Sequence, residues 1–304
     1  MGIDVIAPEG ARAATAWAIG EPGRAAVEVT GGRPTQPSGL ADVELTSASL
    51  GSMVAVAATV RGLLHRTLDE PRQDAYALSS IASPSGEESL IAVVCDGVGS
   101  LAQSHEAAQL VSRTLATEAA EGRAWPEAFA HANQQLQVLM EEASDRGDGA
   151  NGGGMATTAV ALVARRDGDE WVGDLAWVGD SSCWHLQDDG CWRRLGPPME
   201  GDDESGYYTG SVTPLPSEDG ACECKTFRVE SGSLFLMSDG VANPLAWIPE
   251  VQDVLAEWWR VPPDALTFAG QVGFARKTHI DDRTAVGIWH QPKVEEVSGE
   301  DPEV

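Results

Sequence analysis

The chain has 304 residues, enough for one large domain or two small ones, and 42% of them are hydrophobic. It carries 47 acidic and 20 basic residues, which gives a formal net charge of -27. This charge argues against nucleic acid and against an anionic membrane surface as partners, because both attract Lys and Arg. Most of the carboxylates are expected on a solvated surface, while any that cluster would bind hard cations, which prefer oxygen ligands.

The five cysteines are odd in number and show no zinc-type spacing, so we interpret all of them as reduced thiols. No apolar run approaches the roughly 20 residues of a membrane span. The N-terminus lacks the basic stretch and apolar core of a secretory signal. We therefore expect a cytoplasmic protein.

Residues 1–50 are rich in Ala, Gly, Pro and Thr and predict a partly ordered N-terminal extension. The pattern then changes to short apolar runs typical of strands. Strands are expected over residues 54–60, 75–82, 90–95, 157–164, 171–178, 182–187, 191–195, 226–229, 234–238 and 284–289. Helices are expected over residues 104–121, 125–143, 251–259 and 265–276.

The remaining stretches predict loops and a tail. The glycine-rich residues 147–154 predict a flexible loop, and no Gly-Lys-Ser/Thr follows to make it a phosphate-binding P-loop. Residues 196–220 contain four prolines and predict a surface loop long enough to act as a lid. Residues 293–304 predict an acidic, disordered tail. Because strands and helices are segregated along residues 51–292, the fold class is α+β, a sandwich of antiparallel sheets with helices outside.

Acidic residues lie at the ends of several expected core strands. Asp96, Asp180 and Asp239 each follow an apolar run, and Asp281-Asp282 precedes the last strand. A single Asp-Gly pair indicates a turn, but four such sites predict carboxylates that converge at one sheet edge. Packed carboxylates repel each other, and Mg²⁺ or Mn²⁺ ions would relieve that repulsion. Two adjacent metal ions can activate a water for displacement at phosphorus.

The ordered set of motifs resembles the metal-dependent protein phosphatases of type 2C, and most closely a bacterial, actinobacterial-like subgroup. The motifs are Arg72-Gln73-Asp74-Ala75, Asp96-Gly97-Val98-Gly99-Ser100, Thr157-Thr158, Val178-Gly179-Asp180-Ser181, Ser238-Asp239-Gly240 and Asp281-Asp282-Arg283-Thr284. The resemblance covers about residues 54–290. It implies an αββα four-layer sandwich and metal-dependent hydrolysis of phosphoserine or phosphothreonine on proteins, by direct attack of a metal-bridging water.

The same resemblance assigns the metal ligands. Asp96 would bridge two ions, and the carbonyl of Gly97 would bind the second of them. Asp239 and Asp282 would hold the first, and Asp180 would share a third site with Asp239. The implied cofactors are two or three Mg²⁺ or Mn²⁺ ions.

Other positions depart from the family pattern. Asp74 would orient metal-bound waters, and Gln73 stands where many relatives have a metal-side Glu. Asp69 stands where the family often has a phosphate-binding Arg, which leaves His65, Arg66 and Arg72 as candidates for that role, with His65 the first choice. Val98 stands where many eukaryotic relatives have a proton-donating His, so a metal-bound water or His65 would have to donate that proton.

Three hypotheses of function remain open. The first is a phosphatase of phosphorylated proteins with a cognate Ser/Thr protein kinase as its counterpart. The second is a pseudophosphatase-like regulator that binds metal and phosphoprotein or kinase partners with little turnover, which Gln73 and the missing arginine favour. The third is a sporulation- or stress-type phosphatase that acts on one anti-sigma antagonist.

Overall fold

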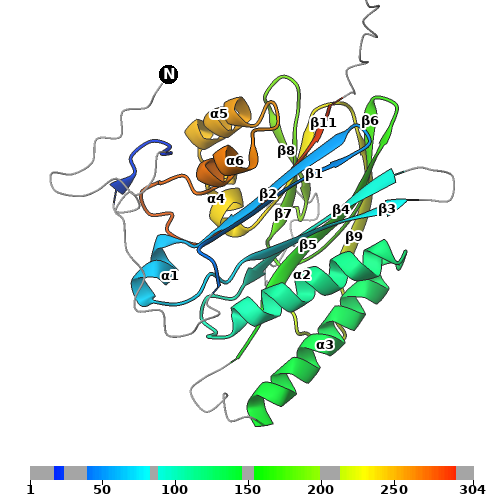
Figure 1. Ribbon diagram of the computed structural model, residues 1–304, viewed down its shortest axis with the longest axis vertical. Coiled ribbons are helices and arrows are strands. Elements are labelled where there is room, and N and C mark those ends of the chain that lie inside the picture. Colours follow the sequence, from blue (N-terminus) through cyan, green and yellow to red (C-terminus); the bar gives the residue numbers. More distant parts are fainter. Residues whose placement is uncertain (1–16, 24–39, 83–87, 146–153, 199–212, 292–304) are drawn as a thin grey trace, which may run out of the picture.

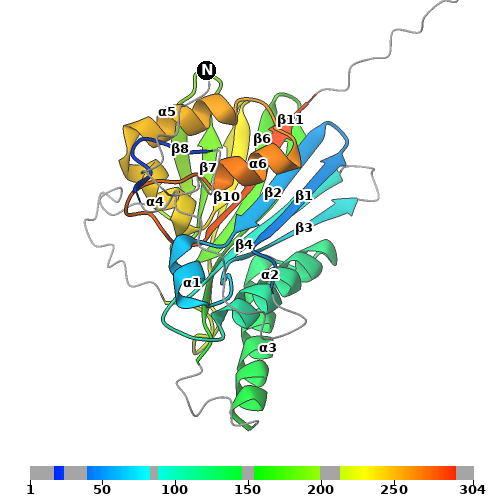
Figure 2. The ribbon, with the colours of Figure 1, turned by 60° about the vertical axis from the view of Figure 1, so that its left-hand side comes forward.

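The computed structural model describes residues 17–23, 40–82, 88–145, 154–198 and 213–291. Two antiparallel sheets pack face to face, and helices cover the outer face of each (Figures 1 and 2). The predicted α+β sandwich of antiparallel sheets is confirmed. None of the helices in the described ranges is long and apolar enough to cross a membrane.

The first sheet has six strands in the spatial order β1-β2-β11-β10-β7-β8. These are β1 (Val43–Leu50), β2 (Met53–Val60), β11 (Arg283–His290), β10 (Ser233–Met237), β7 (Ser182–Leu186) and β8 (Trp192–Gly196). The last strand of the chain is therefore inserted at the centre of this sheet, between β2 and β10.

The second sheet has five strands in the order β3-β4-β5-β6-β9. These are β3 (Ala75–Ala82), β4 (Glu88–Gly97), β5 (Thr157–Asp167), β6 (Glu170–Val178) and β9 (Glu223–Val229). Strands β3 to β6 form a simple meander, and β9 joins at the edge.

Two groups of helices complete the four layers. The helices are α1 (Leu63–Leu68), α2 (Ser104–Ala120), α3 (Trp125–Asp145), α4 (Asp239–Trp247), α5 (Pro249–Trp258) and α6 (Ala265–Val272). The long pair α2 and α3 covers the five-stranded sheet, and α4, α5 and α6 cover the six-stranded sheet (Figure 2). The short helix α1 lies at one end of the sandwich (Figure 1).

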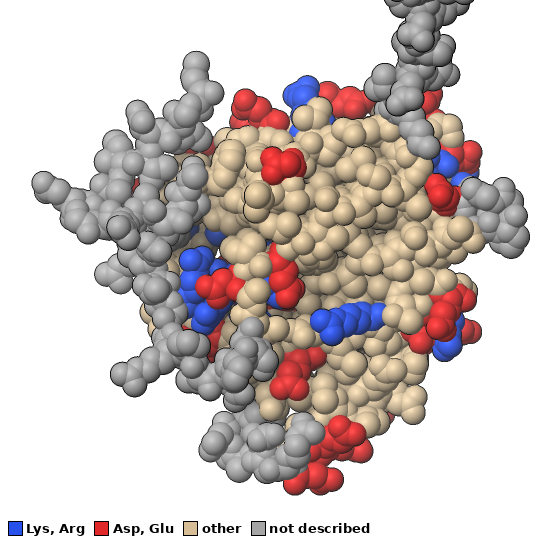
Figure 3. All heavy atoms as spheres, viewed as in Figure 1, with Lys and Arg blue, Asp and Glu red and all other residues tan. Residues whose placement is uncertain are grey.

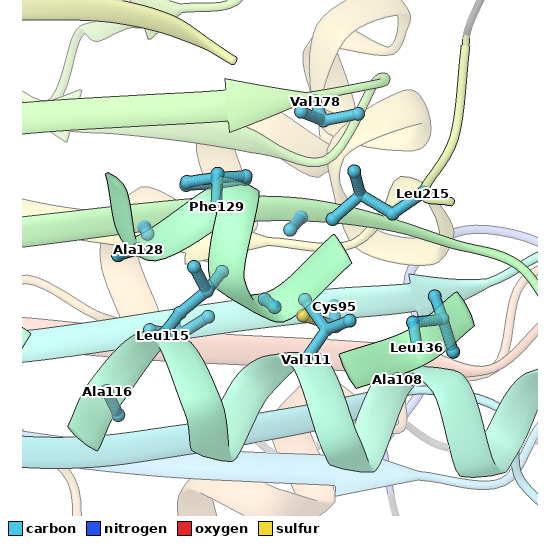
Figure 4. Packing of buried hydrophobic residues seen from close by; sticks show 14 of the residues in the cluster. Cys95, Ala108, Val111, Leu115, Ala116, Ala128, Phe129, Leu136, Val178 and Leu215 are labelled. Atoms are coloured by element: carbon cyan, nitrogen blue, oxygen red, sulfur yellow. The ribbon is translucent and has the colours of Figure 1, made fainter. Parts of the chain in front are cut away.

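Strand β4 shows why the layers form. Its residues alternate between two apolar environments, as a period of two requires. Ile91, Val93 and Cys95 face α2 and α3, where Val111 and Phe129 pack with them (Figure 4). The intervening Leu90, Ala92 and Val94 face the other sheet. A strand buried on both faces reads as the continuous apolar run seen in the sequence.

The N-terminal extension contributes to the sheet before residue 51. Strand β1 pairs with β2 along its whole length, from Val43 opposite Val60 to Leu50 opposite Met53. Farther upstream, Trp17 packs edge-on against Trp258, and Ala18 bridges to Ala275. The predicted tail 293–304, and most of the predicted loops 147–154 and 196–220, lie outside the described residues.

Sequence reading missed helix α4, because Asp239-Gly240 and Asn243-Pro244 both resemble turn signals. A proline inside a helix has no N–H for the carbonyl four residues earlier. Here that carbonyl belongs to Gly240, and it accepts a hydrogen bond from Nε of Arg283 at 3.1 Å. The sequence did predict β10 before this helix, and α6 and β11 after it. The bond from Arg283 to Gly240 joins residues 43 positions apart, so no local sequence pattern reveals α4.

Candidate metal centre and active site

One end of the sandwich gathers strand ends from both sheets. In the five-stranded sheet, β4 reaches Asp96 at this end, and β6 stops just before Asp180. The chain then crosses to β7, whose first residues pair with the end of β10. Asp239 follows β10, and Asp281-Asp282 immediately precedes β11. The topology therefore gathers at one end the strand ends that carry these acidic residues.

The carboxylates of this cluster strongly perturb one another. Burial raises the pKa of Asp96 well above its ordinary range, and four neighbouring carboxylates add to the shift: Asp74, Asp239, Asp180 and Asp281. Burial also raises the pKa of Asp239 to about 6, with further contributions from Asp281 and Asp180. The carboxyl groups of Asp239 and Asp96 lie within hydrogen-bonding reach of each other. Crowded, buried carboxylates of this kind form an environment that a divalent cation would stabilise.

Asp74 lies behind the cluster and is 3% exposed. Its Oδ2 accepts hydrogen bonds from the Ser238 hydroxyl at 2.6 Å and from the Thr284 hydroxyl at 2.8 Å. Burial, followed by the charge of Asp282, raises the pKa of Asp74 to about 8, and the two hydroxyl bonds oppose that shift. Ser238 and Thr284 thus fix one carboxylate oxygen of Asp74. Their motifs are visible in the sequence, but their convergence on Asp74 is not.

Asp282 is a buried anchor. Its Oδ1 accepts a hydrogen bond from the backbone N–H of Gly62 at 2.6 Å, and its Oδ2 accepts one from that of Gln73, also at 2.6 Å. Nδ1 of His65 lies 2.9 Å from the same Oδ1. At 2% exposure, Asp282 is less accessible to an ion than an exposed carboxylate would be, and its predicted role as a metal ligand stays a prediction.

Asp281 has the opposite environment. It is exposed, and its charge raises the pKa of both Asp239 and Asp96. Ligand atoms of His65, Asp281 and Asp282 lie within 4.8 Å of one another, but only Asp281 among the three is exposed. Sequence spacing could not separate Asp281 from Asp282, because the two are adjacent. Accessibility to the cluster favours Asp281 as the ligand.

The donor set suits divalent hard cations. Gln73 is 2% exposed, and its Oε1 is buried without a hydrogen-bond partner in the described part of the chain. Such an orphaned oxygen beside mutually repelling carboxylates suits a hydrated cation, which supplies both positive charge and water donors. Gly97 adds a close backbone approach, because a Cβ there would lie 2.8 Å from the carbonyl oxygen of Gln73.

His65 is placed on α1 and is 2% exposed. Burial by itself would lower its pKa, but the hydrogen bond and charge of Asp282 outweigh burial, so the pKa of His65 is raised above its ordinary value. The imidazole is thus an ion-pair partner of Asp282. Its predicted roles as phosphate ligand and proton donor stay predictions.

The two arginine candidates differ in their contacts. Arg72 is 1% exposed, donates Nε to the carbonyl of Asp74, and forms an ion pair with Glu44 at 2.8 Å. These bonds tie β1 to the turn before β3, and the predicted phosphate-binding role of Arg72 stays a prediction. Arg66 donates only Nε, to the carbonyl of Arg61 at 3.0 Å. Its two terminal nitrogens have no partner within the ranges that the structure describes.

Several solved structures of bacterial phosphatases have a fold similar to that of this chain. A bacterial serine phosphatase matches with a TM-score of 0.51 and 15% identity, covering 79% of this chain and 98% of that one. The S. agalactiae serine/threonine phosphatase has the same score and identity, covering 82% and 100%. RsbX in complex with magnesium matches with a TM-score of 0.50 and 12% identity, covering 81% and 98%. These likenesses establish a shared fold.

The sequence itself finds no match among curated proteins. A model of the protein phosphatase 2C family, however, matches residues 61–267, which include four of the five motifs that carry the aspartates described above. The match includes all five strands of the second sheet and strands β7, β8 and β10 of the first, and it extends into α6. The chain belongs to the protein phosphatase 2C family.

Proposed function

We propose that this protein hydrolyses phosphoserine or phosphothreonine on protein substrates, using two or three Mg²⁺ or Mn²⁺ ions. The observation that carries the proposal is the cluster of carboxylates at one end of the sandwich, where burial, together with mutual repulsion, raises the pKa of Asp96 and Asp239. Family membership supports the reaction class. The magnesium in the structure of RsbX, a protein of the same fold, supports the choice of cation.

In this proposal Asp96, Asp239, Asp281 and Asp180 hold the ions, together with the carbonyl of Gly97. Divalent ions bound there supply an activated water and neutralise negative charge on the phosphoryl group. Asp281 replaces Asp282 in the ligand set that the sequence predicted. Asp282 instead fixes the two loops that carry Gly62 and Gln73.

The buried groups around the ligands orient water. Asp74 is held by Ser238 and Thr284, so its Oδ1 remains available to accept a hydrogen bond from a water in the cluster. Gln73 offers Oε1 in the same way but adds no charge.

The proposal is tested with purified full-length protein. With Mn²⁺ it should cleave p-nitrophenyl phosphate and a phosphothreonine peptide, and Asp239→Asn should reduce both rates by at least about 100-fold. Asp188→Asn, at an exposed carboxylate in the β7–β8 turn, is the matched control and should leave the rates unchanged. Full activity in excess chelator would contradict the proposal.

A regulatory function is the second hypothesis, and Gln73 favours it because an amide replaces a charge beside the ions. Metal binding with micromolar affinity but no turnover of any phosphopeptide would establish it. A cognate Ser/Thr kinase is proposed as the counterpart in either case.

A further inference from the structure

A small pocket of about 40 Å³ lies between α1 and the loop that precedes β11. Its charged lining consists of Arg61, Arg66, Arg283 and Asp281. A single buried water needs roughly 10–15 Å³, so the pocket has room for a group of several atoms. The pocket lining is thus mainly basic, although the chain as a whole is acidic, with 47 acidic and 20 basic residues.

Each of the three guanidinium groups has an unused donor. Arg61 pairs with Asp42 and donates to a carbonyl, but its Nε is buried without a partner in the described ranges. Arg283, which is 7% exposed, donates Nε and Nη2 to carbonyls, and no described acceptor contacts its Nη1. Among the described residues, neither terminal nitrogen of Arg66 has a hydrogen-bond partner. Of these donors, Nε of Arg61 is the buried one, and a buried donor left unpaired costs about 1–3 kcal/mol. An oxyanion is a ligand that accepts hydrogen bonds from several such donors at once.

The arginines also lie close enough to repel one another. Burial lowers the pKa of Arg283 to about 10, and the charge of Arg66 lowers it further, while Asp281 opposes both. In the view of Figure 3, basic side chains gather where Figure 1 places α1. Asp281 is the acidic group in the pocket lining, and its charge also acts on Asp96 and Asp239. Asp281 therefore lies between the carboxylate cluster and the pocket and contributes to both.

We propose that this pocket is an oxyanion subsite for a group on the substrate other than the phosphate that is cleaved. The group is a second phosphate, or the carboxylate of an acidic residue, close in sequence to the phosphorylated serine or threonine. A phosphoryl group held at the cluster lies on one side of Asp281, and the second anion binds Arg66, Arg283 and Arg61 on the other. Cations at the cluster neutralise Asp281 and leave the pocket positive.

The substrate part of this inference rests on the proposed function, so the first test does not depend on activity. Inorganic sulfate is titrated into the Mg²⁺-loaded protein, with calorimetry and the NMR signals of the arginine Nε–Hε groups as readouts. Saturable binding is expected, and Arg66→Gln should weaken it about tenfold, the loss of one charge-assisted contact. Arg66→Lys keeps the charge and should restore part of the affinity. Arg113→Gln, an equal charge change on exposed α2, should leave it unchanged.

The second test compares three phosphothreonine peptides of one length, with a neighbouring phosphoserine, a neighbouring glutamate or a neutral residue. In the Mn²⁺ enzyme, Arg66→Gln should lower kcat/KM about tenfold more for the peptide whose neighbouring group occupies the pocket than for the neutral peptide. The peptide whose kcat/KM falls most in Arg66→Gln identifies whether the second anion is a phosphate or a carboxylate. Absence of all turnover contradicts the proposed function but leaves the sulfate result standing. Sulfate binding that is absent, or identical in Arg66→Gln, overturns the pocket.

Discussion

The backbone N–H of Gln73 donates to Oδ2 of Asp282 at 2.6 Å, across 209 residues of sequence. The other oxygen of Asp282 accepts from Gly62, so one buried side chain fixes both the start of α1 and the turn before β3. A Cβ at Gly62 would lie 2.2 Å from the carbonyl carbon of Asp281, so glycine is needed for this approach. The two adjacent aspartates therefore differ in role. Asp282 connects the loops that carry Gly62 and Gln73, and Asp281 acts on the carboxylate cluster.

This difference predicts that substitution of Asp282 lowers stability, whereas substitution of Asp281 weakens metal binding. Asp282→Ala leaves two buried N–H groups without an acceptor and should lower the free energy of unfolding by about 3 kcal/mol. Asp281→Ala should change the stability of the metal-free protein little, yet weaken Mn²⁺ binding at least about tenfold. Thermal unfolding in chelator and calorimetric Mn²⁺ titration measure the two effects. If Asp281→Ala bound Mn²⁺ normally and a folded Asp282→Asn did not, the assignment would be reversed.

The orphaned oxygen of Gln73 leads to a second prediction. Gln73→Glu adds a carboxylate of nearly equal shape at the edge of the cluster. It should tighten Mn²⁺ binding about tenfold, because a charged ligand or water acceptor replaces a neutral one. The same change should destabilise the metal-free protein, since it adds a like charge to a buried acidic site. Gln73→Met serves as the control for volume, and an unchanged Mn²⁺ affinity in Gln73→Glu would place Gln73 away from the ions.

The extent to which sequence predicts this molecule follows from the range of each interaction. Strand β3 was predicted at its observed bounds, and β4 at its centre, because a buried strand leaves a local apolar run. The aspartates at the ends of β4, β6 and β10 were recognised for the same reason. The contacts of Arg72 with Glu44, and of Arg283 with the carbonyl of Gly240, join residues far apart in the chain, so neither was predictable.

The raised pKa values predict an unusual dependence of stability on pH. Asp239 titrates near 6 in the folded, metal-free protein and near its ordinary value of about 4 when unfolded. The folded form thus binds the proton more tightly, so its stability should increase as the pH falls from 8 through 6 towards 4. Asp239 alone contributes about 2–3 kcal/mol to that change.

Saturating Mn²⁺ should reverse this trend, because ions bind the ionised carboxylates and compete with protons. Thermal unfolding at pH 5.5 and pH 8, with chelator and with Mn²⁺, gives the four values needed. Asp239→Asn should make the chelator curve less steep, and the raised pKa of Asp74 accounts for the slope that remains. A metal-free protein that loses stability between pH 8 and pH 5.5 would show that these carboxylates do not repel one another in the folded state.

The upstream segment gives the last prediction. Gly270 lies inside α6, where alanine ordinarily stabilises a helix by about 1 kcal/mol relative to glycine. Here a Cβ would lie 2.4 Å from Nε1 of Trp17, whose indole packs against Trp258. Gly270→Ala should therefore displace Trp17 and destabilise the protein by about 1–3 kcal/mol, with a change in tryptophan fluorescence. In a Trp17→Ala background the clash disappears, and the same Gly270→Ala substitution should become stabilising. A double-mutant cycle measures this change of sign, and additive effects of the two substitutions would mean that Trp17 does not rest on α6 in solution.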